Sequence, residues 1–169
     1  MIHNTHFYQF ITPLKMHLVT GTWAPAAGGT AGWVCMSKTA AANTPVITIP
    51  IDIPQNSIAL QGSKLVSIDL WYEIATAAAN AITPVINKCT LPADNTAYAA
   101  VAAQVFSYDT GHDTAAKRYA VQKHKMTLTL TTPIWLSELD EILVQLTADC
   151  AATTALTIYG ARALFTFRT

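Results

Sequence analysis

A strand-like ribbon at residues 62–74, GSKLVSIDLWYEI, constrains the fold of this chain more than any other stretch. The positions between its apolar residues are mostly polar, and Trp71 is the exception. The apolar parity consists of Val66, Ile68, Leu70, Tyr72 and Ile74. Side chains of a strand alternate between two faces, so a second sheet must cover the apolar face of this ribbon. Trp71 indicates that part of the other face is covered as well.

Similar alternation elsewhere predicts further strands. They are expected at residues 33–36, 46–53, 83–90, 104–108, 125–131, 142–148 and 154–168. We expect residues 83–90 to return beside the ribbon as its antiparallel partner. In the last strand the apolar parity changes around Gly160, which predicts a β-bulge there.

Three segments carry weaker signals. Turn formers in residues 21–32 predict a flexible loop, and residues 133–141 predict a turn or short helix. The alanine-rich residues 93–103 are compatible with a short capped helix or with a loop that leads into the strand at 104–108. We favour the loop because the surrounding chain has β patterning.

These patterns predict an all-β fold. Roughly seven to nine strands, no long helix and no internal repeat are typical of an antiparallel β-sandwich, and a jelly-roll-like arrangement suits this length. Residues 21–169 are expected to form a single domain. Residues 1–20 form either edge strands or an extended N-terminal arm that pairs with a neighbouring subunit.

Charged residues are scarce. They make up 12% of the chain and sum to a net charge of zero, whereas a soluble domain has about 25%. A low-charge surface rich in Ala and Thr suits a subunit whose faces are covered by neighbours, although a monomer with such a surface is the alternative. The chain has no basic stripe for nucleic acid and no apolar run of the ~18 residues that a membrane span needs.

The sequence also bears on the compartment. The N-terminus lacks the features of a signal peptide, and the three cysteines have no CxxC spacing. An odd number of widely separated cysteines predicts buried thiols from a reducing compartment. We therefore expect the protein to be made and assembled in a cytoplasm.

No motif predicts catalysis. The best candidate for a chemical site is a polar cluster that fits either a divalent metal site or a hydrogen-bonded turn, and we favour the turn because the spacing matches no metal motif. Its members are Asp109, His112, Asp113 and His124. The triplet Asp109–Gly111 has the DTG sequence of aspartic proteases, but no second copy is present. We expect a non-enzymatic protein without a metal or other cofactor.

Aromatic and histidine residues near the N-terminus are candidates for an assembly interface. The candidates are His3, His6, Phe7, Tyr8, Phe10 and, in the following loop, Trp23. An exposed Trp23 is also suited to stacking on a sugar ring. Trp33, Trp71 and Trp135 lie in or beside predicted strands, where packing is the expected role.

Three stretches carry a resemblance to a known class of proteins. They are GSKLVSIDLWYEIAT, HKMTLTLTTPIWL and the terminal LTIYGARALFTFRT. In layout they resemble the jelly-roll structural proteins of bacteriophages, over roughly residues 60–169. The resemblance implies a capsid, decoration or tail subunit in the virion, with copies of itself and other virion proteins as partners. It supplies no functional residues, and a carbohydrate- or receptor-binding module is the alternative function.

Overall fold

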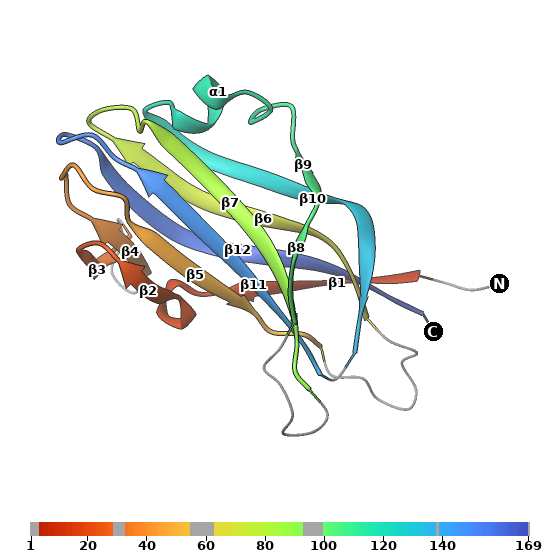
Figure 1. Cartoon of the computed structure of the whole chain (residues 1–169). Coiled ribbons are helices and arrows are strands. Elements are labelled where there is room, and N and C mark those ends of the chain that lie inside the picture. The colour runs from red at the N-terminus through yellow and green to blue at the C-terminus, as the bar shows by residue number, and fades with distance from the viewer. Residues whose placement is uncertain (1–3, 29–32, 55–62, 93–99, 138, 169) are drawn as a thin grey trace.

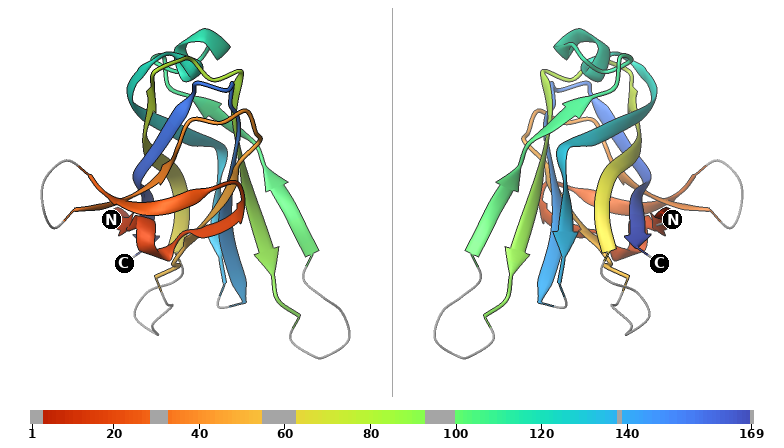
Figure 2. Two further views of the ribbon diagram at one scale, coloured as in Figure 1. Left: turned by 90° about the vertical axis from the view of Figure 1, so that its left-hand side faces the viewer. Right: turned by 90° about the vertical axis from the view of Figure 1, so that its right-hand side faces the viewer.

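Two antiparallel sheets face each other in the computed structural model, which describes residues 4–28, 33–54, 63–92, 100–137 and 139–168 (Figures 1 and 2). The strands are β1 (Asn4–Ile11), β2 (His17–Thr20), β3 (Trp23–Ala27), β4 (Val34–Lys38), β5 (Val46–Ile51), β6 (Ser63–Ala75), β7 (Ala81–Thr90), β8 (Ala100–Gln104), β9 (Phe106–Tyr108), β10 (Gln122–Leu136), β11 (Asp140–Asp149) and β12 (Ala155–Arg168). The helices are the 3₁₀ turn η1 (Pro13–Lys15) and α1 (Ala115–Tyr119).

The strand order is that of a jelly roll. The seven-stranded sheet has the order β3-β4-β12-β6-β10-β9, with β1 also paired to β12, and the five-stranded sheet has the order β2-β5-β11-β7-β8. From β4 onward the chain changes sheet between β4 and β5, β5 and β6, β6 and β7, β8 and β9, β10 and β11, and β11 and β12. The four-strand orders β4-β12-β6-β10 and β5-β11-β7-β8 are thus interleaved, as in a jelly roll. The predicted antiparallel β-sandwich is confirmed.

The predicted partner of the ribbon was wrong. β6 pairs with β10 and β12, whereas β7 lies in the opposite sheet between β11 and β8. β10 and β12 have 15 and 14 residues and occupy both edges of the 13-residue β6. With both edges of β6 paired, the short connection to β7 crosses to the other sheet instead of closing a hairpin.

Two proline-containing segments form strands where we expected irregular structure. β3 lies within the predicted loop, where Pro25 is tolerated because β3 is an edge strand. β10 continues through Leu136, and Pro133 falls in the irregularity between Thr129 and Ile134. The helix α1 was not predicted, and β8 already begins at residue 100. Residues 93–99, which we expected to be helix or loop, lie outside the described part of the chain.

The core lies between the two sheets. Its inward-facing residues include Ile47, Ile49 and Ile51 of β5, Met126, Leu128 and Leu130 of β10, and Ile142, Val144 and Leu146 of β11. In β6 the inward face differs from the prediction at one end, because Leu65 is buried and Val66 is only half-buried. The register passes from Leu164↔Ser67 to Phe165↔Leu65, so Val66 is the extra residue of a bulge.

The described part of the N-terminal segment forms edge strands within its own chain. β1 pairs with the second half of β12, from Asn4↔Arg168 to Ile11↔Ala161, and β2 pairs with β5. Ile11 is fully buried and anchors the end of β1 in the core. The burial of this side chain makes β1 part of the sandwich.

The predicted bulge at Gly160 is confirmed. The register of β12 against β6 shifts between Ile158 and Gly160, and Gly160 has φ +147°. A Cβ atom at this position would lie 2.6 Å from Phe10 Cζ and 3.1 Å from the Ile11 carbonyl oxygen. Gly160 therefore supplies both a backbone conformation that other residues rarely adopt and the space that the Phe10 ring occupies.

We expect Gly160→Ala to lower the free energy of unfolding by about 1–3 kcal/mol, because the substitution combines a disfavoured φ with a steric contact against Phe10. Urea denaturation followed by circular dichroism measures this difference. An unchanged urea midpoint would show that β12 accommodates a side chain at the bulge.

Candidate functional site

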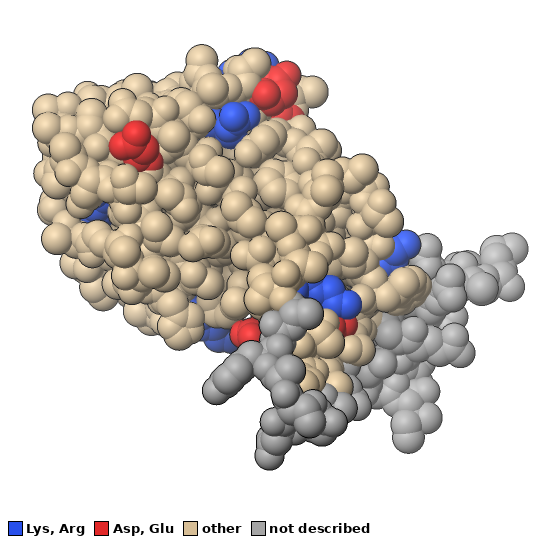
Figure 3. Space-filling model, viewed as in Figure 1, with Lys and Arg blue, Asp and Glu red and all other residues tan. Residues whose placement is uncertain are grey.

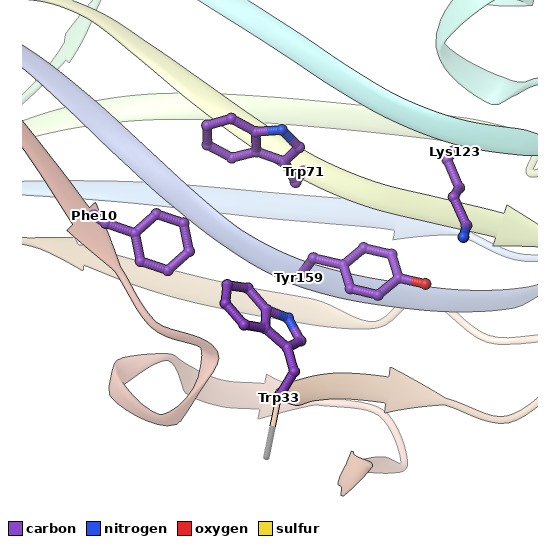
Figure 4. A pocket seen from close by; sticks show the side chains of 5 residues that line it. All are labelled: Phe10, Trp33, Trp71, Lys123 and Tyr159. Carbon is purple, nitrogen blue, oxygen red and sulfur yellow. The ribbon is translucent and has the colours of Figure 1, made fainter. Parts of the chain in front are cut away.

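A pocket lined mainly by aromatic side chains lies on the outer face of the seven-stranded sheet (Figure 4). Its volume is about 370 Å³. Its lining comes from β1, the residue before β4, β6, β10 and β12, in the form of Phe10, Trp33, Trp71, Lys123 and Tyr159. Five separate segments thus converge on one place.

Phe10 lies between the two indoles. Its ring centroid is 6.0 Å from that of Trp33 and 6.2 Å from that of Trp71, with interplanar angles of 54° and 49°. Tilted rings at this separation attract each other. Nevertheless Phe10 and Trp33 remain 45% and 48% exposed, so the cluster presents ring surface to solvent.

Neighbouring groups hold the indoles in place. The Arg162 guanidinium lies 5.4 Å from the Trp71 ring centroid and donates hydrogen bonds of 2.6 and 3.1 Å to Asp69 Oδ2. This ion pair fixes the cation against the ring. A Cβ atom on Gly28 would fall on the Trp33 indole, and the Gly28 N–H donates to the Trp33 carbonyl at 2.8 Å. The position of the Trp33 ring therefore requires a glycine at position 28.

Polar groups surround the aromatic rings. The Tyr159 hydroxyl donates to the Glu73 carboxylate, and burial together with this carboxylate raises the pKa of Tyr159 to about 12. Among the described residues, neither the Lys123 ammonium nor the indole N–H groups of Trp33 and Trp71 have a hydrogen-bond partner. The pocket therefore combines apolar ring faces with hydrogen-bond donors, and the Glu73 carboxylate is bound to Tyr159 at its border.

The sequence marked only part of this pocket. Phe10 was among the predicted interface residues, and Trp71 was noticed because it interrupts the polar parity of the ribbon. Trp33 is more exposed than a packing role requires. Tyr159 was not singled out, although its position before the bulge at Gly160 was a usable signal.

The other predicted interface residues occupy different surroundings. His6, Phe7 and Tyr8 are exposed on β1, while His3 lies outside the described residues. Tyr8 faces outward, with the Arg162 guanidinium 4.5 Å from its ring, and Phe7 packs edge-on against Phe167.

Trp23 lies apart from the exposed aromatic residues of β1. It belongs to β3 and packs against the core, and its indole N–H donates to the Thr20 carbonyl at 3.0 Å. A half-buried, hydrogen-bonded Trp23 offers little surface for stacking.

Most of the predicted polar cluster forms a buried hydrogen-bonded chain. Asp109 accepts from His112 Nδ1 at 2.9 Å, His112 Nε2 lies 3.1 Å from His124 Nδ1, and His124 Nε2 donates to the Ala120 carbonyl at 2.9 Å. Asp113 is separate and pairs with Lys117 at the surface. In the described ranges, no group of three His, Cys, Asp or Glu side chains is placed to hold a metal ion.

The hydrogen-bond partners of the two histidines determine which of their ring nitrogens carry protons. A carbonyl only accepts, so His124 Nε2 carries a proton, and a neutral His124 presents an unprotonated Nδ1 to His112. His112 Nδ1 donates to the Asp109 carboxylate, and a single proton joins His112 Nε2 to His124 Nδ1. Burial, with the nearby His112 charge, lowers the pKa of His124. Burial alone would raise the pKa of Asp109, but hydrogen bonds from the Thr127 N–H and His112 lower it.

The outer face of the five-stranded sheet has a different character (Figure 3). Its surface is almost entirely uncharged, with a few Lys, Arg, Asp and Glu side chains near the margins. The alternating burial of the three central strands assigns the outward positions to Val46, Thr48 and Pro50 of β5, Leu143, Gln145 and Thr147 of β11, and Thr83, Val85 and Asn87 of β7. The two edge strands of this sheet also expose large apolar side chains, which are Leu18 and Val19 in β2 and Val101 in β8.

Comparison with known proteins gave likenesses in structure alone. No family model and no curated protein sequence matches the chain. The solved structures similar to it include an arabinose-bound GH51 α-L-arabinofuranosidase (TM-score 0.42, 11% identity, 94% of this chain and 24% of that one). Another is the K1 cleaved adhesin domain of Lys-gingipain from Porphyromonas gingivalis W83 (0.39, 12%, 94% and 97%). A third is the low-affinity xylan-binding module CBM86 from Roseburia intestinalis (0.37, 11%, 96% and 96%).

These likenesses carry no argument about function. The chain spans about a quarter of the arabinofuranosidase, and all three TM-scores lie below 0.5.

Among the described residues, no helix has the length and apolar character needed to cross a membrane.

The buried histidine pair predicts a pH dependence of stability. The pKa of His124 is lower in the folded state than the ~6.5 of an unfolded chain. The unfolded state therefore binds more protons, and we expect the free energy of unfolding to fall as the pH decreases below about 6.5. Urea denaturation between pH 5 and pH 8 measures the slope. His124→Asn should reduce this slope, while His17→Asn, at an exposed position, should leave it unchanged.

Proposed function

We propose that this chain is a non-enzymatic structural subunit of a virion, in a capsid, decoration or tail. It acts through repeated contacts with copies of itself and with other virion proteins. The observation that carries the proposal is the uncharged outer face of the five-stranded sheet (Figure 3). The phage-like layout of the sequence accords with it.

The chemistry of this face is that of a surface covered in an assembly. The centres of protein interfaces are depleted of charged residues, because burying a charge without a partner is unfavourable. The outward residues at its centre are Thr, Val, Leu, Pro, Asn and Gln, so covering the centre buries no charge, while Glu141 and Asp149 lie outward at the two ends of β11. Charged residues keep a water-exposed surface soluble, and the centre of this face lacks them.

The edges of the same sheet support repeated contacts. β2 and β8 are its two edge strands, and neither contains Lys, Arg, Asp, Glu or Pro. These are the residues with which sheets protect a free edge from pairing with another chain. Because the two edges lie on opposite sides of the sheet, contact between β2 of one copy and β8 of the next is head-to-tail, and such contacts generate rings or tubes.

The cysteines support assembly in a host cytoplasm. Cys35, Cys89 and Cys150 are free and buried. Burial raises the pKa of Cys89 and Cys150, which keeps both as unreactive thiols.

The test places one charge at the middle of the uncharged face. Gln145 lies in the central strand β11, opposite Thr48 and Val85. We expect wild-type protein to form regular particles, rings or tubes, and Gln145→Lys to shift it toward the 18.2 kDa monomer by at least tenfold in midpoint concentration. Light scattering and negative-stain microscopy of the same samples measure this shift.

Thr129→Lys is the matched control. Thr129 is an exposed threonine of β10 in the other sheet, and the same charge there should leave assembly unchanged. Wild-type protein that remains monomeric at high concentration would contradict the proposal. A deletion of residues 1–12 is a poorer test, because it removes β1 and the buried Ile11 from the sandwich.

A further inference from the structure

We propose that the aromatic pocket on the outer face of the seven-stranded sheet binds a pyranose unit of a carbohydrate chain. This goes beyond the structural role proposed above and depends on a different face of the molecule. The pocket is formed by Phe10, Trp33, Trp71, Lys123 and Tyr159 (Figure 4).

The pocket matches a sugar ring in size and surface. A volume of about 370 Å³ falls within the roughly 300–1,000 Å³ typical of small-ligand sites. A pyranose has faces of C–H groups that pack on aromatic rings, and here the exposed rings of Phe10 and Trp33 stand beside that of Trp71. The Phe10 ring is tilted by 54° against Trp33 and by 49° against Trp71, so the three rings are not coplanar and form the walls of a cup for a single sugar unit.

The polar groups of the pocket match the edge of a sugar. Lys123 lies directly across from Glu73 in the register of β10 and β6, and it lines the pocket together with Tyr159, which binds Glu73. Glu73 accepts a hydrogen bond from Tyr159 through Oε2, and its Oε1 has no hydrogen-bond partner among the described residues. A sugar hydroxyl both donates and accepts, so one hydroxyl can satisfy the ammonium and the carboxylate together.

The same donors argue against an apolar side chain of a partner protein as the occupant. Such a side chain would cover the Lys123 ammonium and the indole N–H groups of Trp33 and Trp71 without pairing them, since none has a partner within the described ranges. Leaving a buried donor unpaired costs about 1–3 kcal/mol, and more for a charged group. Hydroxyl groups around a sugar ring remove that cost.

Two glycines indicate that the pocket is a built feature of the fold. Gly160 leaves room for the ring of Phe10, and Gly28 leaves room for that of Trp33. The Asp69–Arg162 ion pair holds a cation against Trp71. Rings fixed before the ligand arrives lose little conformational freedom on binding, which favours a useful affinity from a small contact area.

Isothermal titration calorimetry with cellohexaose, maltohexaose and mannohexaose tests the proposal. We expect saturable binding of at least one of these probes with a Kd between about 1 μM and 1 mM. Trp33→Ala should weaken that binding by about tenfold or more, and Lys123→Met should weaken it severalfold. Both side chains are at the surface, so neither variant threatens the fold.

Trp135→Ala is the matched control, because Trp135 is 41% exposed against 48% for Trp33 and belongs to the same sheet without lining the pocket. It should bind as wild type does. Absence of saturable binding for all three probes would overturn the proposal, as would equal affinity in the Trp33→Ala and Trp135→Ala variants. Gln145→Lys should retain sugar binding and Trp33→Ala should retain assembly, so failure of one proposal is distinguishable from failure of the other.

Discussion

The pairing of β12 with β6 is the constraint on which the rest of the structure depends. β12 follows β6 along its length, while its other edge pairs first with β4 and then with β1. Gly160 lies at the change of partner, where the register shifts. The bulge increases the local twist. Because Gly160 has no side chain, the Phe10 ring can lie close above the strand. One backbone feature thus admits the N-terminal strand to the sheet and also sets one wall of the aromatic pocket.

Local alternation of apolar and polar residues made most strands predictable from the sequence, but it did not predict which strands pair with each other. Met126, Leu128 and Leu130 face inward as expected because their environment depends only on which side of the strand they occupy. The partner of β7 depends on the length and closure of the whole sheet, which residues 83–90 do not encode by themselves. A bulge also hides its effect until the neighbouring strand is placed, as at Val66.

The site was less predictable than the fold because its members are distant in sequence. Asp109, His112 and His124 lie within one short segment, and the sequence grouped them, together with the separate Asp113, as a hydrogen-bonded turn in preference to a metal site. Phe10, Trp71 and Tyr159 meet only because β1, β6 and β12 are neighbours. Lys38 gave no sequence signal at all, yet it is buried with its ammonium donating to the carbonyls of Thr39, Ala41 and Thr154.

The contrast between the two outer faces determines how assembly and binding can coexist. The larger sheet carries Asp69, Lys125 and Arg162 around Trp71, and covering these groups with another subunit would remove water from several charges. The smaller sheet has no such groups in its centre. Desolvation therefore favours burial of the smaller sheet and leaves the charged, aromatic face in water. A subunit packed in this way would present its pocket outward, where a carbohydrate chain has access to it.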